Sequence, residues 1–151
     1  MVSGTMFCVT AQYALRVLAY LSAQPKDSVV GGQDLSGRTG IPRNYLSKLL
    51  LVLGNAGIIE ATRGSGGGYR LSSEPEKIPL IRIVELFDRQ VVKRGCLLGL
   101  RPVCADEDPC TAHHAWKFAK TAYFDFLEST TLRDISGDGQ QPLLKAGSRK
   151  R

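Results

Sequence analysis

The stretch Thr39–Leu50, TGIPRNYLSKLL, decides the fold of this 151-residue chain. Its first four residues predict a tight turn leading into a helix, and proline suits a first helical turn, where its missing amide hydrogen is not needed. Apolar side chains then recur at helical spacing, at Leu46, Leu49, Leu50 and Leu53. The opposite side of the first half is polar and basic, with Arg43, Asn44, Ser47 and Lys48. The stretch therefore predicts a turn followed by an amphipathic helix.

Two interpretations of this polar face compete, because such faces are usually only solvated. However, a short helix, a turn with glycine and a second helix with a basic first half form a helix-turn-helix. Gln33–Arg38 predicts the short first helix, although two glycines weaken it. Arginine reads guanine, asparagine reads adenine, and serine and lysine contact bases or phosphates. We therefore expect DNA contacts from Arg43, Asn44, Ser47 and Lys48.

The neighbouring segments complete a small helical unit. Upstream, Thr10 is a suitable N-cap for a first helix with an apolar face, and Pro25 ends that helix. Downstream, Gly57 is expected to close the recognition helix in the left-handed conformation. Two extended runs follow, Ile58–Arg63 and Tyr69–Leu71, joined by the sequence GSGGG.

The glycine-rich sequence admits two interpretations. A phosphate-binding loop is excluded, because no Gly-Lys-Ser/Thr follows and Tyr69 stands where the last glycine of G-x-G-x-x-G belongs. A β-hairpin wing fits better, since a flexible tip lets the backbone approach the minor groove while an arginine enters it. We expect wing contacts to DNA from Arg63, Gly66 and Gly67.

The C-terminal half predicts three further helices. Pro79 begins the first, Thr111–Glu128 forms a long one, and Ser129–Thr131 caps a short last one. The long helix carries two adjacent apolar stripes, one formed by Ala115, Phe118, Ala119, Ala122 and Phe126 and the other by Trp116, Tyr123 and Leu127. Two stripes favour a dimer interface over a helix packed wholly within its own chain. Residues 137–151 are polar and basic, which predicts a disordered tail.

Three of the four cysteines, Cys96, Cys104 and Cys110, lie in one loop, and His113 and His114 follow it. Isolated cysteines are commonly buried apolar side chains, but this loop offers little apolar core. If a helix begins at Cys110, both histidines lie over that cysteine, and thiolate with imidazole suits zinc or an iron–sulfur cluster. A metal or cluster site is the first interpretation, redox-active thiols the second and inert thiols the third.

The net charge of +6 is concentrated at the C-terminal end, where the last nine residues carry four Lys or Arg and no acid. The basic balance is therefore weak support for nucleic-acid binding. The N-terminus lacks a basic segment followed by a smooth apolar run, so neither a signal peptide nor a membrane span is expected. We expect a cytoplasmic protein, in which clustered cysteines indicate metal binding or catalysis rather than disulfides.

In type and order, these segments resemble the IscR/NsrR family of bacterial winged-helix transcription regulators. The resemblance covers Met6–Ile135 and is most specific in TAQYALRVLAYL, TGIPRNYLSKLL, RGSGGGYRL and CTAHHAW. It implies a homodimer that binds a palindromic operator on double-stranded DNA and holds an iron–sulfur cluster in the loop before the dimerisation helix. The state of the cluster then sets the DNA affinity.

The expected fold is mostly α with a small β-wing. A winged helix-turn-helix DNA-binding region spans residues 6–78, and a helix, the cysteine loop and a long C-terminal dimerisation helix span residues 79–136. The disordered basic tail covers residues 137–151.

The resemblance implies Cys96, Cys104 and Cys110 as thiolate ligands and His113 as the fourth ligand. A two-iron (2Fe-2S) cluster is favoured over a four-iron (4Fe-4S) cluster, because one histidine ligand suits it. The sequence departs from the family twice: seven residues rather than five separate Cys96 from Cys104, and Gln12 stands where some members have a ligating acid. His114, Cys8, an acid of the loop or a residue of a partner chain are the alternatives as fourth ligand.

The expected function is a DNA-binding regulator, not an enzyme, that senses redox state, iron–sulfur supply or nitric oxide. One alternative is the same fold with a structural zinc or no metal, acting as a non-sensing repressor. A remote alternative is a thiol redox enzyme, although the chain has no C-x-x-C pair. The sequence does not define the operator, the target genes, the signal or the sign of regulation.

Overall fold

The computed structural model describes residues 6–89 and 95–137. Those ranges are mainly helical, with one two-stranded antiparallel sheet, which confirms the expected fold class. The elements in chain order are α1 (Val9–Ser22), α2 (Gly32–Thr39), α3 (Arg43–Asn55), β1 (Ile59–Thr62), β2 (Gly68–Leu71), η1 (Pro75–Lys77), α4 (Leu80–Phe87), α5 (His113–Ser129) and α6 (Leu132–Ile135). Apart from Gly137, the predicted tail lies outside the described residues.

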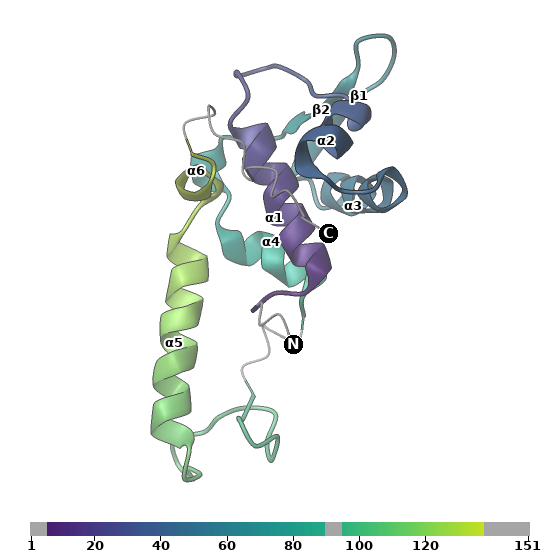
Figure 1. Ribbon diagram of the computed structural model, residues 1–151. Helices are drawn as coiled ribbons and strands as arrows, with labels where there is room; N and C mark the ends of the chain where they lie inside the picture. Colours follow the sequence, from purple (N-terminus) through teal and green to yellow (C-terminus); the bar gives the residue numbers. More distant parts are fainter. Residues whose placement is uncertain (1–5, 90–94, 138–151) are drawn as a thin grey trace, which may run out of the picture.

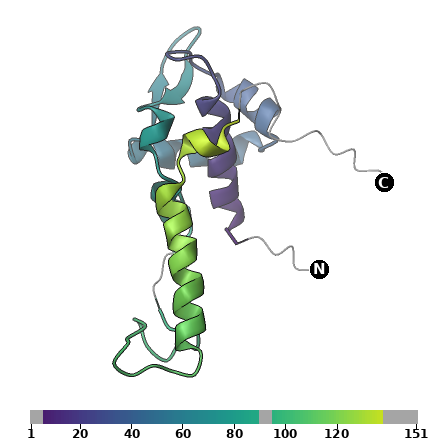
Figure 2. The same ribbon diagram turned by 90° about the vertical axis from the view of Figure 1, so that its left-hand side faces the viewer.

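Helix α1 lies at the centre of the helical unit, and α5 extends away from it (Figures 1 and 2). The hairpin tip is at one end of the molecule, and the cysteine loop is at the other, at the start of α5. One apolar core joins helices α1 to α6: Leu18 of α1, Leu53 of α3, Ile83 of α4 and Leu127 of α5 are each fully buried in it. The C-terminal half of α5 is thereby anchored, while its first half projects.

The turn between α2 and α3 is built by local hydrogen bonds. Gly40 has a φ of 70°, a conformation that glycine adopts without strain, and its N–H donates to the Ser36 carbonyl at 2.9 Å. The Ser36 hydroxyl donates to the Ile41 carbonyl at 2.7 Å. Pro42 is the N-cap residue of α3 rather than part of its first turn, a shift of one position from the prediction. Gly57, with a φ of 68°, follows the end of α3 as predicted.

The predicted N-cap of α1 is wrong. The helix begins after Cys8, whose Sγ accepts the N–H of Ala11 at 3.4 Å, and the Cys8 N–H donates to the Asp88 carboxylate at 2.6 Å. The hydroxyl of Thr10 instead contacts the Tyr45 hydroxyl on α3. The start of α1 is thus fixed by the end of α4, which immediately precedes the cysteine loop.

The hairpin wing is confirmed, with Glu60 opposite Arg70 and Thr62 opposite Gly68. The Tyr69 N–H and carbonyl both bond Val30 at 2.9 Å, which holds the base of the hairpin against the segment before α2. A Cβ on Gly68 would lie 2.5 Å from the Val30 carbonyl oxygen, so this close approach requires glycine.

Helix α5 begins at His113, two residues later than predicted. Cys110 therefore precedes the helix, and its carbonyl accepts the His113 N–H at 2.9 Å in a turn. The short α6 has the predicted cap: the Asp134 carboxylate accepts from both the N–H and the hydroxyl of Thr131, at 2.7 and 2.9 Å. No helix in the described ranges is both long enough and apolar enough to cross a membrane.

Candidate DNA-binding surface and metal centre

The first half of α3 presents a polar face to solvent. Arg43, Asn44, Ser47 and Lys48 are all exposed there, whereas the leucine stripe on the opposite side is buried. The Ser47 hydroxyl donates to the Arg43 carbonyl at 2.9 Å, so this hydroxyl already has a hydrogen-bond partner within the helix. In the described part of the chain, neither Arg43 nor Lys48 forms an ion pair. Both cations are therefore available to an external anion.

The two arginines that flank the wing differ in their surroundings. Arg63 is exposed at the start of the tip, beside Gly66 and Gly67. Arg70 donates two hydrogen bonds to the Glu60 carboxylate, from Nε at 3.1 Å and from Nη2 at 3.0 Å, and it lies 3.8 Å from Asp27. Of the two, Arg63 is the one whose charge is open to a ligand.

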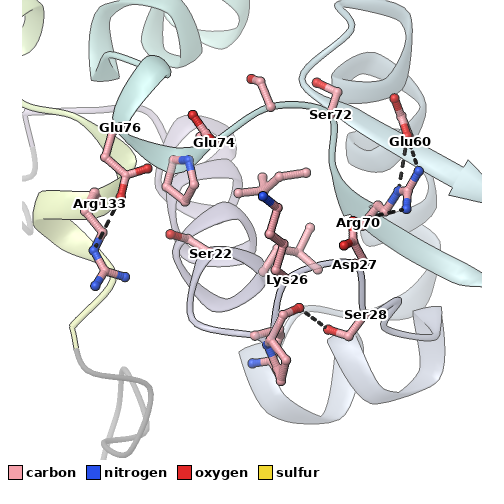
Figure 3. A pocket seen from close by; sticks show the side chains of 16 residues that line it. Ser22, Lys26, Asp27, Ser28, Glu60, Arg70, Ser72, Glu74, Glu76 and Arg133 are labelled. Atoms are coloured by element: carbon pink, nitrogen blue, oxygen red, sulfur yellow. Dashed lines mark hydrogen bonds and ion pairs between the residues drawn. The ribbon is translucent and has the colours of Figure 1, made fainter.

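A large cavity lies away from both predicted sites. It has a volume of about 730 Å³ and lies between the end of α1, the base of the hairpin, η1 and α6 (Figure 3). Its charged side chains largely pair with one another, as in the Arg70–Glu60 pair and in the Arg133–Glu76 pair at 3.7 Å. None of the cysteines lines it. Its size alone therefore does not make it the functional site.

A smaller cavity brings the predicted ligands together. It has a volume of about 190 Å³, and Cys96, Cys104, Cys110 and His113 all line it. His114 is exposed on the next position of α5, with its ring packed edge-on against that of His113. Cys8 lies at the start of α1, where its Sγ donates to the Phe87 carbonyl at 3.4 Å. Neither of these two alternatives lines the cavity.

Cys96 lies in a backbone pocket that favours its thiolate. Hydrogen bonds from the N–H groups of Leu98 first, and then of Leu100 and Gly99, lower the pKa of the Cys96 thiol below its ordinary value. The Cys110 thiol donates to Cys96 as well and acts in the same direction. Because metals bind thiolate rather than thiol, this environment favours ligation.

His113 is the most enclosed side chain of the cavity, with only 2 % of its surface exposed. Its Nδ1 lies 3.1 Å from Cys104 Sγ, and its Nε2 lies 2.7 Å from Asp106 Oδ1. Hydrogen bonds from Lys117, at 2.6 and 2.7 Å, and then from His113 lower the pKa of the Asp106 carboxyl. No local sequence pattern indicates this contact, because it depends on how the loop folds back onto α5.

Other contacts fix the loop to α5 and stabilise its own conformation. The Gly95 carbonyl accepts from Trp116 Nε1 at 3.1 Å and from Lys120 Nζ at 3.2 Å. Arg101 Nη1 donates to the Asp108 carbonyl at 3.0 Å and its Nη2 pairs with the Asp108 carboxylate. Two acids of the loop, Asp106 and Asp108, are exposed to solvent and also hold neighbouring side chains in place.

The donor set fits an iron–sulfur centre. Three thiols and one imidazole border a single cavity, and these are the ligand types that such clusters use. Within residues 6–89 and 95–137, no three His, Cys, Asp or Glu side chains converge closely enough to hold a single metal ion as they stand.

The outer face of α5 is apolar and exposed. Phe118 is 79 % exposed and Phe126 is 49 % exposed, and the three alanines of the first predicted stripe are exposed beside them. Residues of the second stripe face the protein instead: Leu127 is fully buried, and Trp116 and Tyr123 are half-buried. The two stripes thus have different roles, one in the core and one at the surface.

The fold and the exposed polar face of α3 define a winged helix-turn-helix DNA-binding protein. The chain belongs to the Rrf2 family, whose sequence model is described as an iron-dependent transcriptional regulator and matches residues 9–138.

Similar proteins are named as regulators. An HTH-type transcriptional regulator of Aquifex aeolicus is 34 % identical over 132 residues, which is 86 % of this chain and 90 % of that protein. NsrR of Bacillus licheniformis is 32 % identical over 123 residues, which is 82 % of this chain and 86 % of that protein. Since such relatives are transcriptional regulators, the chain is a regulator and not an enzyme.

Solved structures support the fold. IscR of T. potens superposes with a TM-score of 0.70 at 24 % identity, covering 95 % of each chain. CymR of B. subtilis, described as the global cysteine regulator of that organism, gives a TM-score of 0.73 at 22 % identity. The match covers 86 % of this chain and 95 % of the CymR chain.

Proposed function

We propose that this protein is a cytoplasmic homodimer whose affinity for a palindromic DNA operator is set by an iron–sulfur cluster. Cys96, Cys104, Cys110 and His113 would hold the cluster, with a two-iron form favoured. The observation that carries the proposal is the common cavity, since these four side chains are the ones that line it out of the chain's four cysteines and two histidines. The family description as iron-dependent and the similarity to NsrR and IscR proteins support it.

DNA would be read by α3 and the wing. The exposed first half of α3 fits the major groove, where Arg43 and Asn44 are suited to base edges and Ser47 and Lys48 to bases or phosphates. The wing tip, with Arg63, Gly66 and Gly67, would lie in the minor groove. A Cβ on Gly67 would lie 2.2 Å from the Thr62 carbonyl oxygen, so the tip keeps a bare backbone that allows close approach.

The second copy would pack against the exposed stripe of α5. The small side chains of Ala115, Ala119 and Ala122 allow close helix approach, and Phe118 and Phe126 supply apolar area. Stripe residues 115 and 126 are separated by about 16 Å along the helix axis at the usual rise per residue. A twofold pair of such helices would place two recognition helices on one face of DNA, as a palindromic operator requires.

The loop is well placed to couple the cluster to DNA binding. At one end it follows α4, whose last residues hold the start of α1 through the Asp88–Cys8 hydrogen bond. At the other end it leads into α5 and is tied to that helix at Gly95. Closure of the loop around a cluster would therefore shift both α1, which packs against α2 and α3, and the dimer helix.

The proposal is tested by purification without oxygen, followed by visible spectroscopy and analysis of iron and sulfide. We expect visible absorption, with iron and acid-labile sulfide in equal amounts. A colourless protein that carries zinc would favour the structural-zinc alternative, because zinc does not absorb visible light. A colourless metal-free protein would contradict the cluster altogether.

A further inference from the structure

Asp106 links helix α5 to the cysteine cavity through three side chains. Its carboxylate accepts from Lys117 Nζ at 2.6 and 2.7 Å, and its Oδ1 lies 2.7 Å from His113 Nε2. On the opposite edge of the ring, His113 Nδ1 lies 3.1 Å from Cys104 Sγ. The imidazole is 2 % exposed, so these contacts rather than water decide how it is oriented.

The chemistry of these partners decides which ring nitrogen carries the proton. An ionised carboxylate accepts hydrogen bonds and cannot donate them, so Nε2 must be the protonated nitrogen when it faces Asp106. In the neutral ring, Nδ1 then keeps its lone pair, which points toward Cys104. A metal needs such a free lone pair, and the same ring turned over would present N–H instead.

The distance between sulfur and nitrogen is also close to that of two ligands on one metal. Typical metal–sulfur and metal–nitrogen bonds in a tetrahedral site place the two donor atoms about 3.6 Å apart. Cys104 Sγ and His113 Nδ1 lie 3.1 Å apart in this structure. The pair therefore needs to open by only about half an ångström to share a metal.

We propose that Asp106 is the positioning residue of the metal centre: it fixes the tautomer and orientation of His113, so that Nδ1 is the ligating atom. This inference rests on the proposed function, because it assigns a role next to the proposed ligand. The negative charge also makes the imidazole a more basic ligand for a metal, as carboxylates that accept a hydrogen bond from a metal-bound histidine do. Lys117 holds the carboxylate in place, so Asp106 supports the centre without being a ligand itself.

The neighbouring acids provide matched controls. Asp108 is engaged by Arg101, and Glu107 is an exposed residue of the same loop that does not line the cavity. Glu107→Gln removes one loop charge, as Asp106→Asn does, but leaves the contact to His113 intact. Asp106→Asn keeps an oxygen that can accept from Nε2, whereas Asp106→Ala removes the acceptor.

The first measurement uses the metal-free protein. With His114→Gln to leave one histidine, nitrogen-15 NMR near pH 8 reports which ring nitrogen carries the proton. We expect protonated Nε2 in the parent and in Asp106→Asn, and a mixture of both tautomers in Asp106→Ala. A parent protonated at Nδ1, or an Asp106→Ala variant with an unchanged tautomer, would overturn the inference.

The second measurement uses the protein with its cluster. We expect Asp106→Ala to bind iron ~10–100-fold more weakly than the parent, the usual effect of removing such a partner, so that a chelator removes its iron faster. Asp106→Asn should raise the midpoint potential, because a negative charge near the iron is lost, while Glu107→Gln should leave it unchanged. Equal potentials and release rates in all variants would overturn the inference alone. A parent that assembles no iron–sulfur centre would overturn the proposed function, and this inference with it.

Discussion

Replacement of Phe118 by alanine should weaken the dimer without harming the protomer. Phe118 is 79 % exposed in the single chain, and a phenylalanine side chain has about 200 Å² of surface, so about 160 Å² is available to a partner. At about 25 cal/mol per Å², full coverage would contribute about 4 kcal/mol per protomer. If the partner covers half of this area, and the area that alanine would still bury is subtracted, the loss summed over both protomers is about 2–3 kcal/mol per dimer. This loss corresponds to a rise in Kd of about 30–140-fold.

Sedimentation equilibrium over a concentration series measures this change directly. Leu51→Ala is a matched control, because Leu51 is a 64 % exposed apolar residue on α3, far from the α5 stripe in sequence and on another helix. Thermal unfolding of the isolated protomer should be almost unchanged in both variants, since neither side chain belongs to the core. If Phe118→Ala dimerises with the parent Kd, the stripe is not the dimer interface.

Three further predictions concern the two candidate sites. Arg63→Ala should weaken operator binding by about 1–3 kcal/mol, whereas Arg70→Ala should change it little because Glu60 and Asp27 hold that guanidinium; equal losses in DNA titrations would contradict the wing assignment. His113→Ala should alter the visible and EPR spectra, while His114→Ala and Cys8→Ala should not; the reverse pattern would show that His114 or Cys8, and not His113, is the fourth ligand. In the metal-free protein, Cys96 should be alkylated faster than Cys104 at neutral pH. The backbone N–H groups lower the Cys96 pKa, so its thiolate persists at pH values at which an ordinary thiol is already protonated; equal rates from mass-spectrometric mapping would contradict this.

The helical unit and the wing could be predicted because their signals are local. The leucine spacing of α3, the left-handed glycines at positions 40 and 57 and the glycine-rich hairpin each depend on neighbours a few residues away. The start of α1 could not be predicted in the same way. Its N-terminal support is Asp88, 80 residues further along the chain, and such a contact leaves no periodic pattern.

The candidate metal site was predicted only in part. The cysteines stand out by their clustering, and the structure adds that they share a cavity with His113. Cys110 does not open the helix, because α5 begins three residues after it, yet Cys110 and His113 line the same cavity. The contact between Asp106 and His113 arises from the path of an irregular loop, which sequence spacing does not define.

The sequence alone does not show which of the two apolar stripes of α5 is buried. Both have helical spacing, so periodicity alone cannot tell the stripe that faces the core from the stripe that is exposed. The packing of α5 on α4 separates them: Leu127 is fully buried, and Phe118 is 79 % exposed.

Whether an iron–sulfur centre sets the DNA affinity can be measured by comparing the cluster-loaded and the metal-free protein. An operator is first selected from random double-stranded DNA with the cluster-loaded protein, and a second one with the metal-free protein. The Kd of each form for both operators is then measured without oxygen by fluorescence anisotropy at one fixed salt concentration, because salt alone shifts such affinities. We expect the two forms to differ at least about tenfold in Kd for one operator, a difference of about 1.4 kcal/mol. Equal Kd values for both operators, with the cluster intact in the loaded form, would contradict it.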